Sequence, residues 1–311
     1  MHIAVMGSGG LGGYFGARLA AAGTPITFIA RGDHLGAMRA KGLRVKSEQL
    51  GDVLVRPVAA TDNPAEIGPV DCVLFTVKLY DTEPAAHAIR PLIGPGTGVV
   101  TFQNGVESVD MLARILGREH VIGGAAYIPS VIAEPGVIRH TGRLARLVFG
   151  ELDGRRSARV EALLDAFTTA RVEARISDRI EVEIWEKFIP LAAWSGVSAL
   201  TRCHLGPVRD DPETRAMLIA AVEEVIAVTR AKGIALPADA MEQSLTMLLE
   251  TAPAGARASM LEDLERGQPL ELPWLSGTVV RLGNELGVPT PTHAFIATAL
   301  KPHTKGGAGA S

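Results

Sequence analysis

Short apolar runs alternate with amphipathic segments through the first half of the chain. Several of the runs are apolar on both faces, as parallel strands are when helices cover both sides of a sheet. The runs that predict strands are His2–Met6, Ile26–Ala30, Cys72–Val77 and Val99–Phe102. The segments that suit crossover helices are Leu11–Ala22, Glu83–Ile89 and Glu107–Leu116. The pattern predicts an α/β fold with a doubly wound sheet.

Shorter apolar runs continue this pattern as far as residue 149. They are Ala126–Val131, Val137–His140 and Leu144–Phe149. The turn signal Glu134-Pro135-Gly136 separates the first two. We expect these strands to extend the same sheet in the antiparallel direction.

The pattern becomes helical from about Ser177 onward. Helices are expected near 178–200, 212–231, 237–249, 256–265 and 274–286. This change predicts two domains, an α/β domain over 1–175 and an all-helical domain over 176–311. The glycine-rich end, about 305–311, has nothing to pack against and is expected to be disordered.

Composition narrows the class of protein. With 47% hydrophobic residues, 21% charged residues and a net charge of -3, the chain has the profile of a soluble globular protein. It lacks the positive charge that a nucleic-acid partner requires. The longest uncharged apolar segment, Phe188–Thr201, is shorter than the roughly 20 residues that cross a bilayer. Cys72 and Cys203 form no metal-binding pair, and no export signal opens the chain, so we expect a cytoplasmic protein without a metal site.

A glycine-rich loop follows the first predicted strand. The residues Gly7-Ser8-Gly9-Gly10-Leu11-Gly12 satisfy the GxGxxG pattern at the point where a helix begins. In this Rossmann-type arrangement the first glycine permits a tight turn, the second admits a pyrophosphate, and the third lets the helix approach the strand. An ordinary glycine-rich turn is the alternative, and the position after a strand argues against it.

The end of the second strand indicates which dinucleotide is bound. A carboxylate there would bind the ribose 2′-hydroxyl of NAD, whereas this chain has Arg31, which suits a 2′-phosphate. The sequence therefore predicts NADPH. In the alternative interpretation Arg31 is solvated and Asp33 is the ribose ligand.

Polar residues also follow the next two strands. Lys78 ends one of them and Asn104 follows the other, at the sheet edge where ligands bind in open α/β sheets. Lys78 can instead extend along the surface with its amine in water, and Asn104-Gly105 is also a favoured turn.

Lys187 lies in the apolar segment Ile184–Ile189, and no charged residue occurs in the two helical turns that follow it. Burial there would lower the pKa of the amine and make it a general acid near neutral pH. The alternative is an i,i+4 ion pair with Glu183.

Taken together, these residues resemble the ketopantoate (2-dehydropantoate) reductase family nearly from end to end. The matching segments are Gly7–Gly12, Arg31, Thr76-Val77-Lys78, Gln103-Asn104-Gly105, Trp185-Glu186-Lys187, Ser259-Met260-Leu261 and Glu271. The resemblance implies a Rossmann domain that binds NADPH, a helical domain that completes the site, and reduction of ketopantoate to pantoate for coenzyme A synthesis. It also implies a homodimer.

The resemblance assigns roles to particular residues. It makes Lys187 the proton donor, and it places Lys78 and Asn104 beside the nicotinamide and the substrate carboxylate. It also makes Ser259 a ligand of that carboxylate and Glu271 an acceptor for the substrate hydroxyl.

The chain departs from the family after Lys187, in positions where the family commonly has asparagines. Leu191, Ser195 and Leu205 stand there. Ser195 can still bind a substrate, but the leucines cannot form hydrogen bonds. The alternatives to ketopantoate reduction are therefore reduction of a less polar 2-oxo acid or ketone and a non-catalytic NADP(H)-binding regulator.

Overall fold

A computed structural model describes residues 1–48 and 50–307. Its contacts divide the chain into two compact units, Met1–Glu181 and Val182–Ser311. The first unit includes strand β12 (Glu173–Ile176), the turn after it and the first two residues of helix α6 (Ile180–Thr201).

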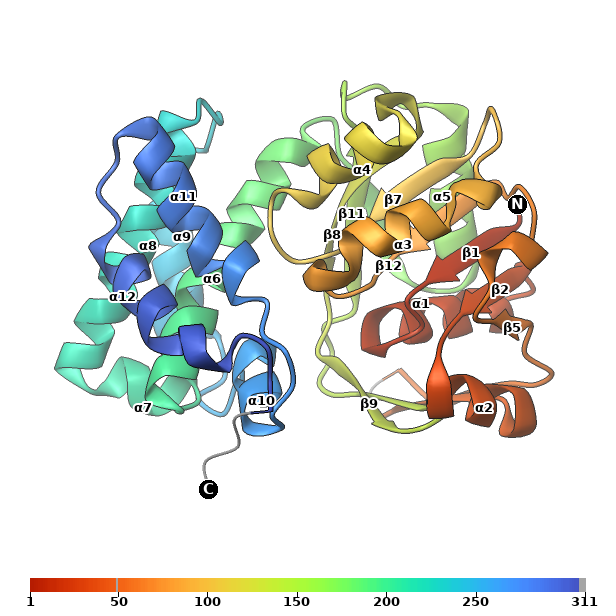
Figure 1. Ribbon diagram of the computed structural model, residues 1–311, viewed down its shortest axis with the longest axis horizontal. Coiled ribbons are helices and arrows are strands. Elements are labelled where there is room, and N and C mark those ends of the chain that lie inside the picture. The colour runs from red at the N-terminus through yellow and green to blue at the C-terminus, as the bar shows by residue number, and fades with distance from the viewer. Residues whose placement is uncertain (49, 308–311) are drawn as a thin grey trace. The chain divides into compact units, whose positions relative to one another are not determined.

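Among the described residues, the first unit contains an eight-stranded sheet in the order β12-β11-β8-β7-β6-β1-β2-β5 (Figure 1). The strands are β1 (Ile3–Met6), β2 (Ile26–Ile29), β5 (Ala60–Thr61), β6 (Cys72–Phe75), β7 (Gly98–Thr101), β8 (Val121–Tyr127), β11 (Arg146–Glu151) and β12. From β8 to β5 in this order, each strand is parallel to its neighbour. Strand β11 pairs antiparallel with β8. Strand β1 lies between β2 and β6, and Ile3 is in register with Ile26 and Cys72.

Helices cover both faces of this sheet. Helices α1 (Gly10–Ala21) and α5 (Ala158–Thr169) contribute Tyr14 and Phe167 to a core that also contains Ile3 and Val5. Helices α3 (Thr82–Ala88) and α4 (Ser108–Leu116) pack on the opposite face, where Ala86 and Leu112 join the alternate strand residues Ala4 and Val73. The buried period-two pattern on both sides confirms the predicted doubly wound sheet.

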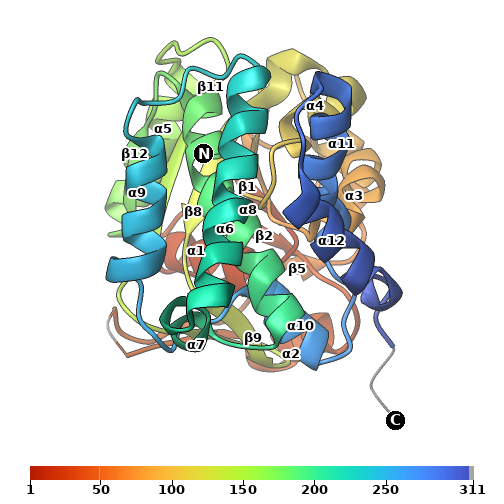
Figure 2. The same ribbon diagram turned by 90° about the vertical axis from the view of Figure 1, so that its left-hand side faces the viewer.

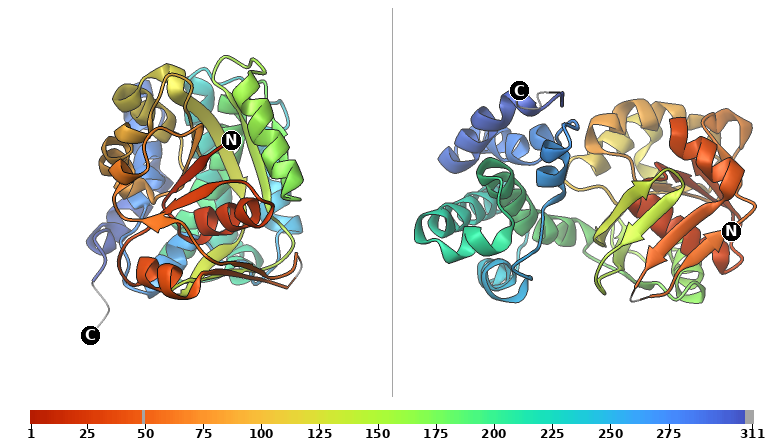
Figure 3. Two further views of the ribbon diagram at one scale, coloured as in Figure 1. Left: turned by 90° about the vertical axis from the view of Figure 1, so that its right-hand side faces the viewer. Right: turned by 90° about the horizontal axis from the view of Figure 1, so that it is seen from below.

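A second sheet in the same unit corrects the expectation for residues 126–140. Its strands, in the order β4-β3-β10-β9, are β4 (Val53–Val55), β3 (Leu43–Ser47), β10 (Val137–His140) and β9 (Ser130–Glu134) (Figure 3). The single strand expected at 126–131 is wrong: β8 ends at Tyr127 and β9 begins at Ser130, with Pro129 between them. Proline has no amide hydrogen for a strand ladder, so the chain leaves the main sheet here. Of the three later runs, Leu144–Phe149 extends the main sheet as expected, through its residues Arg146 to Phe149 in β11.

The second unit is helical (Figure 2). Its helices are α6 (Ile180–Thr201), α7 (Leu205–Asp210), α8 (Pro212–Ala231), α9 (Ala240–Thr246), α10 (Ser259–Glu265), α11 (Ser276–Leu286) and α12 (Pro291–Leu300). Asp211 caps the start of α8, because its carboxylate accepts hydrogen bonds from the amides of Glu213 and Thr214. The described part of this unit contains no strand, as predicted for the all-helical half.

The expected disordered end is described only in part. The amide of Gly307 donates to the carbonyl oxygen of Gly267 at 3.0 Å, while residues 308–311 lie outside the described residues. Within the described ranges, no helix combines the length and apolarity needed to cross a membrane.

Candidate active site

The glycine loop joins β1 to α1, and its glycines have different surroundings. A methyl group at Gly12 would lie 2.3 Å from Thr76 Oγ1 and 2.4 Å from the carbonyl oxygen of Gly7. At Gly9, by contrast, a methyl group would have no described heavy atom within 4 Å. Gly12 therefore serves packing, whereas Gly9 leaves bare backbone at the start of a helix, where an anionic pyrophosphate can approach.

The residue that ties this loop to its surroundings, His34, was missed by the sequence analysis. Its Nε2 lies 2.9 Å from the carbonyl oxygen of Ser8, and its Nδ1 accepts a hydrogen bond from the Gly136 amide at 3.0 Å. Burial lowers the pKa of His34, which favours the neutral ring that this acceptor role requires. Gly136 belongs to the turn between β9 and β10, so the second sheet supports the cofactor loop. No local signal in the sequence connects residues so far apart.

The predicted cofactor residues of the first unit lie at one edge of the main sheet. Arg31 follows β2, Lys78 follows β6 and Asn104 follows β7. Because β7, β6, β1 and β2 are adjacent and parallel, their carboxyl ends meet at the edge that carries the glycine loop.

A buried glutamine network fixes the chain just before Lys78. Gln103 Nε2 donates to the carbonyl oxygen of Val77 at 2.9 Å and to Thr82 Oγ1 at 2.8 Å. Gln103 Oε1 accepts from Thr101 at 3.1 Å. Gln103 is only 7% exposed, so its amide holds the segment around Lys78 in position and does not face solvent.

The second unit brings Lys187 and Glu271 together. Lys187 is on α6, and Glu271 immediately precedes the short turn Leu272–Trp274. Burial lowers the pKa of Lys187 to about 8, and the negative charge of Glu271 partly opposes that shift. Glu271 is itself only 5% exposed. A buried amine of this kind carries a proton near neutral pH and can give it up readily.

Other predicted substrate residues occupy different environments in this unit. Ser195 is fully buried on the face of α6 that also carries Lys187 and Leu191, and its hydroxyl has no hydrogen-bond partner among the described residues. A buried hydroxyl without a partner suits a ligand or water contact. Leu205 is fully buried at the start of α7, whereas Ser259 is exposed as the first residue of α10.

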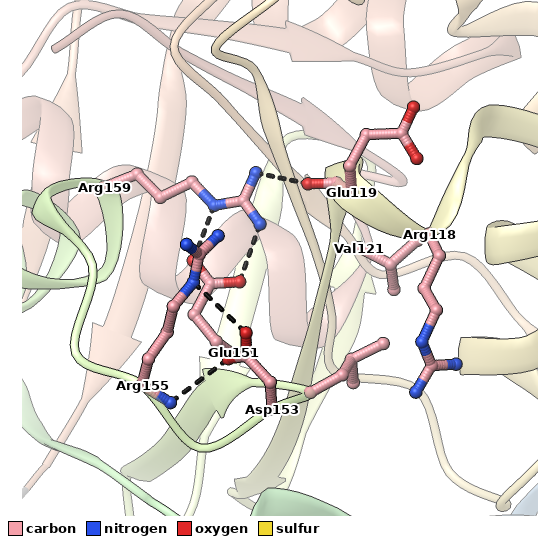
Figure 4. Close-up of a pocket in the computed structure, with 8 residues that line it drawn as sticks. Arg118, Glu119, Val121, Glu151, Asp153, Arg155 and Arg159 are labelled. Carbon is pink, nitrogen blue, oxygen red and sulfur yellow. Dashed lines mark hydrogen bonds and ion pairs between the residues drawn. The ribbon is translucent and has the colours of Figure 1, made fainter.

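A charged pocket of about 270 Å³ lies elsewhere in the first unit (Figure 4). It is next to Val121, where β8 begins, and Glu151, where the antiparallel β11 ends, so it is at the amino ends of the parallel strands. Arg159 donates to both Glu151 oxygens at 2.7 and 2.6 Å and to the carbonyl oxygen of Glu119 at 2.7 Å. These contacts satisfy the guanidinium internally. The pocket is therefore a structural ion-pair network, away from the cofactor loop.

Replacing Glu151 by glutamine is expected to destabilise the first unit by about 3 kcal/mol, because Arg159 would keep its burial and lose its carboxylate. Burial opposes ionisation of Glu151, but hydrogen bonds from Arg159 and Ser157 hold its pKa below the ordinary value of 4.5. The ion pair thus stabilises the unit above pH 4.5, and this stabilisation is lost as the pH falls through the lowered pKa. Urea unfolding at several pH values measures it. Glu161→Gln, which breaks an exposed pair with Arg156, is the control and should change little.

Within the described residues, no group of three histidine, cysteine or acidic side chains is placed to hold a metal ion. Each unit carries its own candidate feature: the first has a loop suited to a dinucleotide, and the second has an amine whose pKa is lowered by burial. These features define the class of the protein as a nicotinamide-dependent oxidoreductase.

Comparison with known proteins gives the family. The model of "Ketopantoate reductase PanE/ApbA" matches residues 3–154, and that of "Ketopantoate reductase PanE/ApbA C terminal" matches 179–304. The chain is 35% identical over 315 residues to the 2-dehydropantoate 2-reductase of Mesorhizobium japonicum, with 94% of each chain covered. The chain belongs to the ketopantoate reductase family and is an NADP-dependent oxidoreductase that acts on CH–OH groups.

Solved structures share the same fold. The crystal structure of 2-dehydropantoate 2-reductase from Geobacter metallireducens is 32% identical, covers 98% of this chain and 100% of its own, and gives a TM-score of 0.90. The ternary structure of D-mandelate dehydrogenase with NADH and anilino(oxo)acetate gives a TM-score of 0.89 at 20% identity, covering 98% of each chain. The second match shows a common fold only.

Proposed function

We propose that the protein reduces a 2-oxo acid with NADPH, that its substrate is 2-dehydropantoate, and that Lys187 donates the proton. The observation that carries this proposal is Lys187, a half-buried residue whose amine has its pKa lowered to about 8 by burial and interacts with the carboxylate of Glu271. Membership of the ketopantoate reductase family supports it independently.

The residues of the first unit fit the cofactor. The bare backbone at Gly9 and the amino end of α1 would hold the pyrophosphate, and Arg31 would hold the 2′-phosphate. Lys78 and Asn104 would line the nicotinamide side of the same edge. When bound, NADPH supplies hydride to the carbonyl carbon of the substrate.

The side chains of the second unit supply the remaining chemistry. A ketone that receives hydride at carbon acquires negative charge on oxygen, and the Lys187 ammonium is suited to protonate that oxygen. Glu271 opposes the loss of the ammonium charge through its own negative charge, and as a carboxylate it can accept a hydrogen bond from a substrate hydroxyl. Ser195 and Ser259 are the proposed ligands for the rest of the substrate.

A less polar 2-oxo acid is the second candidate substrate. Leu205 is fully buried and Leu191 lies on the Lys187 face of α6, so neither position offers a hydrogen bond to a substrate hydroxyl. This apolar character favours a substrate without the hydroxymethyl group of 2-dehydropantoate.

A matched pair of substrates separates the two candidates. 2-Dehydropantoate and 3,3-dimethyl-2-oxobutanoate differ only in one hydroxyl group. If Glu271 binds that hydroxyl, kcat/KM for 2-dehydropantoate should be higher by at least about tenfold in an NADPH oxidation assay, because the analogue would leave the buried carboxylate without that hydrogen bond. Equal or higher kcat/KM for the analogue would favour the less polar substrate, and no turnover of any 2-oxo acid would contradict the proposal.

A further inference from the structure

An ion pair joins the segments that follow β2 and β6, the two strands on either side of β1. Arg31 follows β2 and Asp81 ends the short turn after β6, and β1 lies between these two strands. Arg31 Nη2 lies 2.8 Å from Asp81 Oδ2. The Arg31 side chain is 77% exposed and that of Asp81 is 32% exposed, so both groups are accessible to a ligand at this edge.

The carboxylate of Asp81 has opposite effects on the two nicotinamide cofactors. A 2′-phosphate needs donors from Arg31, and Asp81 occupies the Nη2 donor. The negative charge of the phosphate is also repelled by the carboxylate. The 2′-hydroxyl of NADH is uncharged and is a hydrogen-bond donor, so a carboxylate can accept from it. Asp33, the ribose ligand in the alternative interpretation of this strand end, lies in the first turn of α2 (Gly32–Lys41).

We propose that Asp81 is a specificity-determining residue that opposes the 2′-phosphate and narrows the preference of this protein for NADPH over NADH. The inference deepens the proposed function, because it rests on Arg31 as the ligand of the 2′-phosphate. It does not depend on the identity of the 2-oxo acid or on the role of Lys187.

The test is Asp81→Asn, with the dissociation constants of NADPH and NADH measured by fluorescence titration without substrate. Removing the negative charge beside Arg31 should tighten NADPH binding by about fivefold. NADH binding should stay the same or weaken, because the neutral amide is a poorer acceptor for the 2′-hydroxyl. Asp165→Asn, which removes the same charge from an exposed position on α5, is the matched control and should leave both constants unchanged.

The inference would be overturned if the ratio of the NADPH and NADH dissociation constants were the same in Asp81→Asn as in the unmodified protein. Arg31→Gln provides a second check, since it should weaken NADPH binding by at least about tenfold and leave NADH binding nearly unchanged. Unchanged NADPH affinity in Arg31→Gln would also overturn the inference, because Arg31 would not contact the phosphate. A failure to reduce any 2-oxo acid would contradict the proposed function and leave these binding results intact.

Discussion

Replacing Lys187 by methionine is expected to lower kcat on the true 2-oxo acid by at least about 10²-fold, because the carbonyl oxygen would lose its proton donor. Methionine keeps much of the length and apolar volume of the lysine stem, so the packing of α6 should change little. NADPH affinity should be retained, since the proposed cofactor ligands belong to the other unit. Lys232→Met, at an exposed position after α8, is the control and should retain full activity. Undiminished turnover in Lys187→Met would mean that another group supplies the proton.

The pH dependence of the same reaction follows from the charge on Lys187. A proton donor must be protonated at the start of the step, so kcat should fall as the pH rises through the pKa of about 8. The negative charge of Glu271 raises that pKa, so Glu271→Gln should move the fall in kcat to lower pH. Stopped-flow rates of NADPH oxidation across the pH range measure the shift. Movement to higher pH would contradict the assigned interaction.

Two alanine substitutions in the glycine loop should separate folding from cofactor binding. Gly9→Ala is expected to leave stability almost unchanged, because its methyl group would meet no described atom. It should weaken NADPH binding by at least about tenfold, because the methyl group would occupy the space through which the pyrophosphate approaches the backbone. Gly12→Ala should instead destabilise the first unit by about 2 to 3 kcal/mol, since its methyl group would collide with Thr76 and with the backbone of Gly7.

Urea unfolding and fluorescence titration of NADPH distinguish these outcomes. Gly36→Ala is the matched control: it lies within α2, its methyl group would also meet no described atom, and it should stabilise the protein by about 0.5 to 1 kcal/mol without affecting the cofactor. Loss of stability in Gly9→Ala, or unaltered NADPH affinity, would show that Gly9 does not border the pyrophosphate.

Much of the main sheet could be predicted from the chain because its signals are local. The runs that became β1, β2, β6 and β7 are short, apolar on both faces and separated by helical segments. The segments that became β9 and β10 are also short and each contains valine next to isoleucine, as a strand of either sheet can. Strand pairing depends on partners distant in the chain, and β10 pairs with β3, so their assignment to a second sheet has no local signal.

The candidate site likewise has features that the sequence predicted and features that only the folded chain shows. The glycine pattern located the cofactor loop. It gave no sign of the hydrogen bond that supports this loop, because His34 and Gly136, which form it, are 102 residues apart. The apolar surroundings of Lys187 indicated burial, and the resemblance to the family named Glu271. Only the folded second unit shows that the two charges interact and that burial outweighs this interaction, which leaves the pKa of the amine at about 8.

The sequence by itself determined the kinds of element and their order, the dinucleotide loop and the class of chemistry, because hydrophobic period, glycine spacing and residue type act over a few neighbouring positions. Tertiary structure decided which charged groups meet. Arg31 and Asp81 are 50 residues apart and form an ion pair only because β2 and β6 flank the same central strand. Their interaction depends on the distance between the two side chains, which packing sets and residue order does not.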